Sequence, residues 1–459
     1  MLPNQLQRAQ SELIGRRTTH ILAKLNQHMQ LYGYHLIDIP IIATADLFLV
    51  KAGDQIINNL FTFERQGKQL ALRPEFTASA ANYFANTEGD PVVRWQFSGS
   101  IFNDKSYELD SNYEQLGIGA ELIGLGGSLA DAEIIAMSAT GLVKLGVADT
   151  HITIGHIGLL RELISQFNLD ARTQRFLLHH IPALGDSAKG KQWIFDQFIN
   201  QLSSVKNQVA PAVGNYGEQN DINSGSMQTM GGRTQEDIAR RIRLKQQRLA
   251  NRENVSAVID YIDQWCKVND TPDKTFDYLA KLISDNANAK SLLDEWRETV
   301  TLLEAHQIPL SQITIKPNLS RSWDYYTGIV FELHSNGTHL GGGGRYDDLA
   351  QLIGSKLGTP AVGYAYYGNR LIDALSNTPL LDELTITIIS NDNVLSATKW
   401  ANALRSHGLA VQVIPQPMKV SSSAYDLYLE DATTVRFQTS KYNFQQLDYL
   451  INDIKQISQ

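Results

Sequence analysis

The sequence predicts an α+β protein in which an antiparallel sheet flanked by helices carries a helical insertion and is followed by a small α/β domain. Apolar and polar residues alternate with a period of two in several stretches, such as residues 328–333, which is typical of half-buried strands. Residues 168–309 show helical spacing instead, and short strands and helices follow one another after Pro379. At 459 residues the chain exceeds a single core of about 250 to 300 residues, which predicts two or three domains.

The composition excludes a membrane-spanning protein and a disulfide scaffold. No run of about 18 apolar residues occurs. The single cysteine, Cys266, cannot form an intrachain disulfide or a cysteine-cluster metal site, and we expect it to be buried in a helix. The first residues lack the pattern of a signal peptide, which predicts a cytoplasmic protein. The net charge of -8 removes one argument for nucleic-acid binding, because phosphate backbones are held mainly by lysine and arginine.

The N-terminal part of the chain predicts a long helix, a strand and a hairpin. Residues 5–32 have helical spacing, and Gly33 follows them where a helix C-cap would lie. Residues 34–48 predict a strand ended by Pro40. A hairpin with its turn at residues 65–68 comes next.

Glu75 and Thr77 follow this hairpin directly. On an extended chain, side chains two residues apart lie on one face, so both oxygens can accept hydrogen bonds from one ammonium group. The same two residues also fit a solvated surface strand. Their place just before a predicted helix at residues 78–86 favours a binding pair.

A second hairpin is predicted over residues 94–124, with Phe102 before its turn and Glu121 in the returning strand. A helix and a strand follow, and the strand contains His151 and His156. No further ligand stands at a suitable spacing from these histidines, so we expect both to be structural and predict no metal site.

The middle of the insertion is rich in glycine, asparagine and serine at residues 213–234, which predicts a mobile loop. Thr234 and Asp237 then indicate a capping box for a helix over residues 236–250. Five basic residues give that helix either a nucleic-acid face or an ordinary solvated face, and the second interpretation is the stronger.

The stretch at residues 320–348 carries the strongest local signal. Asn336-Gly337 is the turn dipeptide of a hairpin. Four glycines at 341–344 pack nothing, so we interpret them as space for another molecule against the main chain, with Arg345 directed into it. The alternative is a glycine bulge in an ordinary sheet. Arg321 is expected at a strand edge.

Two linked motifs in this stretch carry a family resemblance. RSWDYYTGIVFE followed by GGGGRYDDL resembles the signature of the histidyl-tRNA synthetase family and of its paralogue, the regulatory subunit of ATP phosphoribosyltransferase. The resemblance implies a class II aminoacyl-tRNA synthetase-like core over residues 1–167 and 310–378, the insertion at 168–309, and a reduced anticodon-binding-like domain at 379–459. It also implies that residues 34–48 form a homodimer interface.

The resemblance further implies a histidine-binding site with an arginine for the carboxylate, aromatic walls for the imidazole and a glycine floor. In the family the segment around Glu75 and Thr77 holds the amino group of histidine, and Arg321 would be catalytic in a ligase. The implied histidine-binding residues are Glu75, Thr77, Glu121, Arg321, Tyr325, Tyr326, Gly343 and Arg345.

The nucleotide side departs from the family pattern. Asn103 stands where an active synthetase has the arginine that grips the ATP α-phosphate, and Lys105-Ser106-Tyr107 replaces Glu-Arg-Pro. Gly117 stands where the family has a glutamine that touches the histidine side chain or amino group, so amino-acid recognition is altered too. An amide cannot replace a guanidinium fork at a phosphate that gains charge in the transition state. Arg370 of the last class II motif remains, so Arg370 and Asn103 are interpreted as a vestigial nucleotide site. We expect no cofactor, and ATP with Mg²⁺ only if the protein is a ligase.

Two functions remain open. In the first, the protein is a catalytically silent paralogue that acts as the regulatory subunit of a short-form ATP phosphoribosyltransferase and binds histidine for feedback control. In the second, it is a divergent histidine-tRNA ligase. The lost arginine, the acidic loop at 107–114 and the shortened C-terminal domain favour the regulator and argue against tRNA binding, whereas Arg370 and the presence of that domain favour the ligase. A third class is a paralogue that serves an unrelated carrier or modification reaction.

Overall fold

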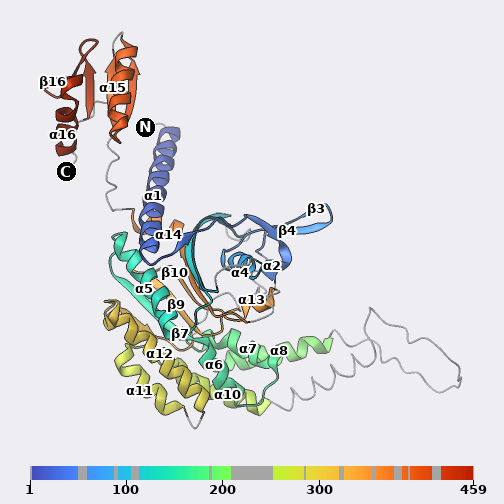
Figure 1. The fold of residues 1–459 in the computed structure, drawn as a ribbon. Coiled ribbons are helices and arrows are strands. Elements are labelled where there is room, and N and C mark those ends of the chain that lie inside the picture. The colour runs from blue at the N-terminus through green and yellow to red at the C-terminus, as the bar shows by residue number, and fades with distance from the viewer. Residues whose placement is uncertain are drawn as a thin grey trace, which may run out of the picture. The chain divides into compact units, whose positions relative to one another are not determined.

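The computed structural model describes residues 3–49, 59–86, 91–104, 113–185, 189–207, 252–283, 286–319, 325–353, 358–376, 385–390, 393–415 and 425–457. The chain divides into two compact units, Met1–Thr378 and Pro379–Gln459 (Figure 1). The division lies where the sequence analysis places the start of the last domain.

An eight-stranded sheet organises the described part of the first unit. Its strand order is β1 (His35–Leu36), β5 (Val93–Phe102), β6 (Glu114–Ile123), β11 (Ala361–Tyr367), β10 (Thr338–Arg345), β9 (Ile329–Ser335), β7 (Thr150–His156) and β8 (Ile313–Ile315). The inner strands pair antiparallel, and only the edge strands β1 and β8 pair parallel to their neighbours. The predicted antiparallel sheet is therefore confirmed.

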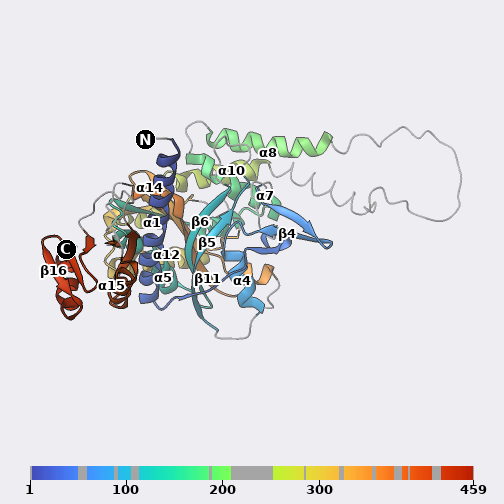
Figure 2. The same cartoon turned by 90° about the horizontal axis from the view of Figure 1, so that it is seen from above.

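Long helices cover one face of this sheet (Figure 2). Helices α1 (Pro3–Leu31) and α5 (Ser128–Lys144) share one hydrophobic cluster with the side chains of β6 and β11 that point to this face, among them Leu122 and Val362. The alanine- and isoleucine-rich sequence of α5 suits this position, since the helix is buried on nearly all sides. The following helix α14 (Gly368–Ala374) ends where Arg17 of α1 donates to the carbonyl oxygens of Leu375 and Ser376.

The opposite face carries helix α4 (Thr77–Asn86), the short helices α2 (Ala45–Leu49) and α13 (Leu349–Leu352), and a three-stranded sheet of order β2 (Ile42–Thr44), β4 (Lys68–Leu72), β3 (Thr62–Arg65). The predicted β3–β4 hairpin is confirmed, with positive φ angles at Gln66 and Gly67 of its turn. The strand predicted to end at Pro40 is present as the short β1, and the strand β2 and helix α2 that follow the proline were not predicted. Pro40 has no N–H to continue a ladder.

The described part of residues 168–309 is helical, as predicted. It comprises α7 (Ala171–His180), η1 (Ile181–Gly185), α8 (Gly190–Asn207), α10 (Arg252–Cys266), α11 (Pro272–Leu282) and α12 (Ala287–Ala305), preceded by α6 (Ile157–Ser165) and followed by η2 (Leu310–Gln312). Trp265 is fully buried, whereas Cys266 beside it is only half-buried, so its predicted burial is incomplete. The predicted capping box and basic helix lie outside the described residues.

The second unit alternates strands and helices, as predicted, with one strand that the sequence analysis missed. It contains β12 (Thr385–Ser390), α15 (Val394–Ser406), β13 (Ala410–Pro415), β14 (Asp426–Leu429), β15 (Thr434–Phe437), β16 (Ser440–Asn443), η3 (Phe444–Gln446) and α16 (Leu447–Ile457). The missed strand is β16, which is too polar to show alternation. Across the described residues of both units, no helix combines the length and apolar character that crossing a bilayer requires.

Candidate functional site

A buried carboxylate on strand β6, Glu121, lies at the centre of the candidate site. Only 1% of this residue is exposed. The Thr77 hydroxyl donates to its Oε1 at 2.6 Å, and the Tyr346 hydroxyl donates to its Oε2. On the neighbouring strand, a Cβ at Gly363 would lie 1.5 Å from Oε2, so only glycine leaves room for the carboxylate there.

The strand register determines which side chains share the face of Glu121. Glu121 pairs with Gly363, Gly363 with Gly344, and Gly344 with Val330. Directly paired residues point to the same face of a sheet. This is the face on which α4 lies, because Thr77 begins that helix and reaches Glu121.

Glu75 has a role that the sequence analysis did not foresee. Its carboxylate accepts hydrogen bonds from the backbone N–H groups of Thr77 and Ala78, the latter at 2.9 Å, and so satisfies the start of α4. The prediction that Glu75 and Thr77 share one face of an extended chain is therefore wrong. Thr77 is already helical, and its side chain turns to Glu121 instead.

The two carboxylates are buried, and the structure places no cation against either of them in the described part of the chain. Burial raises the pKa of Glu121 to about 8, against the opposing effect of the hydrogen bonds from Thr77 and Tyr346. Burial also raises the pKa of Glu75, although its helix-capping hydrogen bonds lower it. A buried acceptor of this kind suits a ligand that brings its own N–H donors.

Tyrosine rings surround this carboxylate. Tyr325 and Tyr326 are buried, with ring centroids 4.8 Å apart, and the Tyr325 ring lies 5.7 Å from that of Tyr346. A Cβ at Gly344 would lie 3.0 Å from the Tyr326 ring, which places Tyr326 over the face of Glu121. The structure therefore brings Glu121, Thr77 and both predicted tyrosines together, while Arg321 lies outside the described residues.

Arg345 does not lie in this pocket, and the prediction that it points into the glycine clearing is wrong. It pairs with Val362, whose side chain belongs to the core on the other face of the sheet. Its guanidinium donates to Asp131 at 2.7 and 3.3 Å and to Asp347 at 3.0 Å. The physical reason is strand alternation, since Arg345 follows Gly344 and must face the opposite way.

The glycine run is required by the sheet itself, in contrast to its sequence interpretation. A Cβ at Gly341 would lie 2.6 Å from the Ala365 carbonyl oxygen, one at Gly343 1.8 Å from that of Gly363, and one at Gly344 2.4 Å from that of Ile329. Gly343 also pairs with Phe331 and Tyr364, which places it on the face of Arg345.

At the predicted nucleotide end, the structure places Asn103 directly after β5, where its N–H donates to the Tyr113 carbonyl oxygen at 3.0 Å. Lys105 lies outside the described residues. Arg370 is exposed, donates to the His339 carbonyl oxygen at 2.8 Å and lies over the Tyr367 ring at 4.7 Å.

The space that a side chain at position 117 would need is occupied. A Cβ at Gly117 would lie 2.9 Å from Phe76, and the Phe76 ring is stacked on Phe97 at 4.3 Å. A longer side chain at 117 would therefore have to displace a packed aromatic pair. Hydrophobic side chains thus fill the space next to Gly117.

The structure also defines the roles of His156 and Tyr346. His156 accepts from the Leu159 N–H at 2.9 Å as the N-cap of α6, which confirms the structural role expected of it. Tyr346, which touches Glu121, was missed. It directly follows the glycine run and Arg345 in the sequence, and that position was the only available signal.

Comparisons with known proteins agree on one family. The family model "Histidyl-tRNA synthetase" matches residues 14–190 and 235–371. The histidine–tRNA ligase of Methanococcus vannielii is 26% identical over 401 residues, covering 85% of this chain and 80% of the relative. The ATP phosphoribosyltransferase regulatory subunit of Dehalococcoides mccartyi is 25% identical over 396 residues, covering 83% of this chain and 80% of the relative.

Solved structures share the fold at lower identity. An ATP phosphoribosyltransferase regulatory subunit/histidyl-tRNA synthetase from Bacillus halodurans has a TM-score of 0.64 at 21% identity, covering 90% of this chain and 93% of that one. Histidyl-tRNA synthetase from Nostoc has a TM-score of 0.66 at 16% identity, covering 96% of each chain. The fold is thus the class II synthetase-like fold that the sequence predicts.

Proposed function

The chain belongs to the histidyl-tRNA synthetase family, and we propose that it is a regulatory member of that family which binds histidine, does not form an adenylate and regulates a short-form ATP phosphoribosyltransferase catalytic subunit. One contrast supports this most. Thr77 and Tyr346 hold the buried Glu121 at the proposed amino-acid end of the site, whereas Asn103 stands where the family resemblance implies an arginine for the α-phosphate.

Histidine matches the chemistry of the pocket. Both its ammonium group and its imidazole carry N–H donors, and Glu121 is a buried acceptor. The tyrosines Tyr325, Tyr326 and Tyr346 offer flat apolar walls with hydroxyl groups, which suits an aromatic ring with polar edges. We propose Glu75, Thr77, Glu121, Arg321, Tyr325 and Tyr326 as histidine-binding residues, with Glu75 acting through the capped start of α4.

Adenylate formation is disfavoured at the other end. Negative charge builds up on the α-phosphate in the transition state, and losing one preorganised donor at such a position costs roughly a hundredfold to a thousandfold in rate. Asn103 carries no charge, and the exposed Arg370 guanidinium is held by the His339 carbonyl oxygen and the Tyr367 ring.

A divergent histidine-tRNA ligase is the second candidate. The retained Arg370 and the α/β unit Pro379–Gln459 favour it, because a ligase needs both a nucleotide site and a means of holding tRNA. In that case Arg321 is the proposed catalytic residue, and ATP with Mg²⁺ is required.

Histidine-dependent exchange between ATP and pyrophosphate tests the proposal. The regulatory function predicts histidine binding by calorimetry, no exchange above background, and a change in the histidine sensitivity of a short-form phosphoribosyltransferase when this protein is added. Robust exchange by the purified protein contradicts the regulatory function and favours the ligase. Absence of histidine binding contradicts both.

The proposal includes a homodimer in the cytoplasm. Around β1 and β2 the side chains of Leu36, Ile41 and Ile42 are 54%, 45% and 50% exposed, an apolar strip that a partner chain would bury. We predict that the double variant Leu36→Glu, Ile42→Glu halves the mass measured by light scattering. Glu64→Lys on the exposed strand β3 is the matched control and leaves the mass unchanged.

A further inference from the structure

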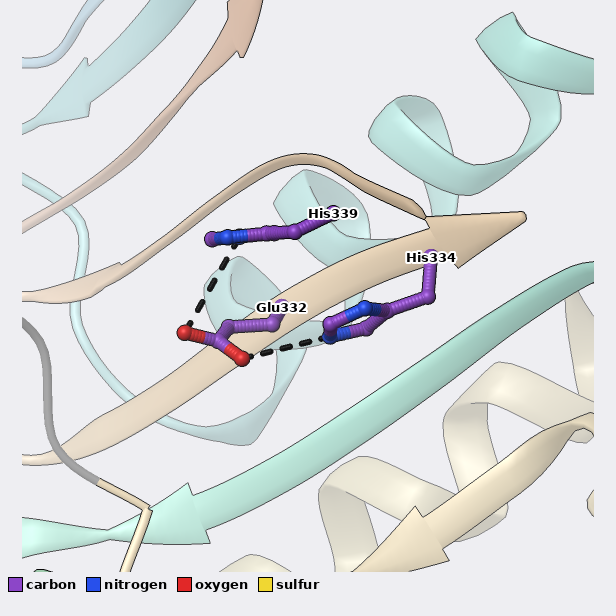
Figure 3. A group of neighbouring side chains, drawn as sticks. All are labelled: Glu332, His334 and His339. Carbon is purple, nitrogen blue, oxygen red and sulfur yellow. Dashed lines mark hydrogen bonds and ion pairs between the residues drawn. The ribbon is translucent and has the colours of Figure 1, made fainter. Parts of the chain in front are cut away.

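Two histidines and a glutamate gather on the β9–β10 hairpin, away from Glu121. They are Glu332 and His334 of β9 and His339 of β10, and their ligand atoms all lie within 4.8 Å of one another. Figure 3 shows both imidazole rings directed at the two oxygens of one carboxylate. We propose that these three side chains bind a divalent transition-metal ion, with Zn²⁺ as the best match, and that water completes the coordination.

The distances are close to those of a metal-bound set. Around tetrahedral zinc, nitrogen and oxygen ligands at about 2.0–2.2 Å from the ion lie about 3.3 Å from one another. Glu332 Oε2 is 3.2 Å from His334 Nε2, and Glu332 Oε1 is 3.9 Å from His339 Nε2. Coordination requires His339 Nε2 to move closer to Glu332 than its present 3.9 Å.

The backbone holds the three residues in place before any ion binds. His334 and His339 are direct partners across the hairpin, and their rings stack at 4.9 Å. Glu332 lies two residues before His334 and therefore on the same face of β9. A register shift follows directly, between His339 and Gly341.

The donor set selects the class of ion. Two imidazoles and one carboxylate suit zinc and neighbouring transition metals, whereas Mg²⁺ and Ca²⁺ prefer oxygen ligands alone. The side chains of His334, Glu332 and His339 are 28%, 21% and 24% exposed, so an ion can enter and keep an open position for water.

Binding of a metal ion breaks one hydrogen bond of His339 and restrains this residue. His339 Nε2 now lies 2.9 Å from the Gly341 carbonyl oxygen, and coordination replaces that hydrogen bond. The His339 carbonyl oxygen accepts from Arg370, and the His339 ring meets the edge of the Tyr367 ring at 5.1 Å. A bound ion therefore restrains His339 next to Arg370.

Titration of tag-free full-length protein, first dialysed against a chelator, tests the site. We expect one Zn²⁺ per chain by calorimetry, the visible d–d bands of tetrahedral Co²⁺, and no displacement by excess Mg²⁺. His334→Gln and His339→Gln should each weaken Zn²⁺ binding at least tenfold. His151→Gln is the matched control, since His151 faces the same side beside His334 but is bonded to Thr314 at 2.6 Å.

Two results would each overturn the proposal. Either no Zn²⁺ or Co²⁺ binding by the wild-type protein, or unchanged stoichiometry and affinity in the double variant His334→Gln, His339→Gln, shows that the three side chains are only a hydrogen-bonded network. Glu332→Gln, which keeps the shape of its side chain, replaces any histidine variant whose circular dichroism melt shows that it does not fold. It should also weaken Zn²⁺ at least tenfold.

Discussion

Replacing Glu121 by glutamine tests the central feature of the site, a buried carboxylate whose pKa is raised to about 8 by burial. The proposed function requires histidine to bind the ionised form, since that form accepts hydrogen bonds from the cationic group of the ligand. With this pKa about one chain in eleven is ionised at pH 7, about one in a hundred at pH 6 and half at pH 8. Apparent affinity scales with the competent fraction, so it should rise roughly fiftyfold from pH 6 to pH 8.

The variant Glu121→Gln removes this dependence. Loss of a charge-assisted hydrogen bond costs about 2 kcal/mol, which is roughly a thirtyfold weaker affinity when both proteins are compared at pH 8.5. Calorimetric titration with histidine at pH 6, 7, 8 and 8.5 measures both effects. The imidazole of the ligand also titrates in this window, and the profile of the variant corrects for it.

Stability provides a second readout of the same carboxylate. Its folded pKa lies above the unfolded value of 4.5, so its contribution to stability is complete below pH 4.5 and is lost as pH rises through about 8. The Glu121→Gln variant should therefore gain stability relative to the wild type between pH 5 and pH 9. Parallel affinity profiles in the two proteins, or equal affinity at pH 8.5, would refute the assignment of Glu121 as the ligand's acceptor.

Three further substitutions test other parts of the structure. Asn103→Arg alone should leave ATP–pyrophosphate exchange at background, because the neighbouring loop also departs from the family, and full activity in this variant would contradict that expectation. Arg345→Gln breaks the buried pair with Asp131 and should cost about 3 kcal/mol, lowering the melting temperature measured by circular dichroism by about 4 °C for a unit of this size. Its histidine affinity should stay within a few fold, since Arg345 faces away from Glu121, and a large loss of affinity would place it in the pocket after all. Gly363→Ala puts a Cβ where the Glu121 carboxylate lies and should abolish measurable histidine binding; wild-type affinity would show that the carboxylate can lie elsewhere.

Local features of the sequence were sufficient to predict most of the fold. The hairpins follow from short signals, such as Asn336-Gly337, whose φ angles are both positive in the structure. The long helices follow from spacing. Strand β2 beyond Pro40 was missed, because whether so short a stretch becomes a strand depends on the partner strand that it meets, here β4.

The site was predicted only in part, for a physical reason. Motif resemblance identified Thr77, Glu121 and the two tyrosines, since those residues stand in recognisable segments. It misplaced Arg345, because a motif gives the residue type and not the face of the strand, and a single step along β10 reverses the direction of the side chain.

The sequence by itself determined that this is a synthetase-like α+β chain, that Glu121 lies in a hairpin strand, and that Asn103 lacks the charge of an arginine. Only the tertiary structure decided that Glu75 caps α4 and that Arg345 pairs with Asp131 behind the sheet. It alone also brought His339 towards Glu332. These outcomes depend on register and the packing of α4, which join residues far apart in the chain and leave no local pattern.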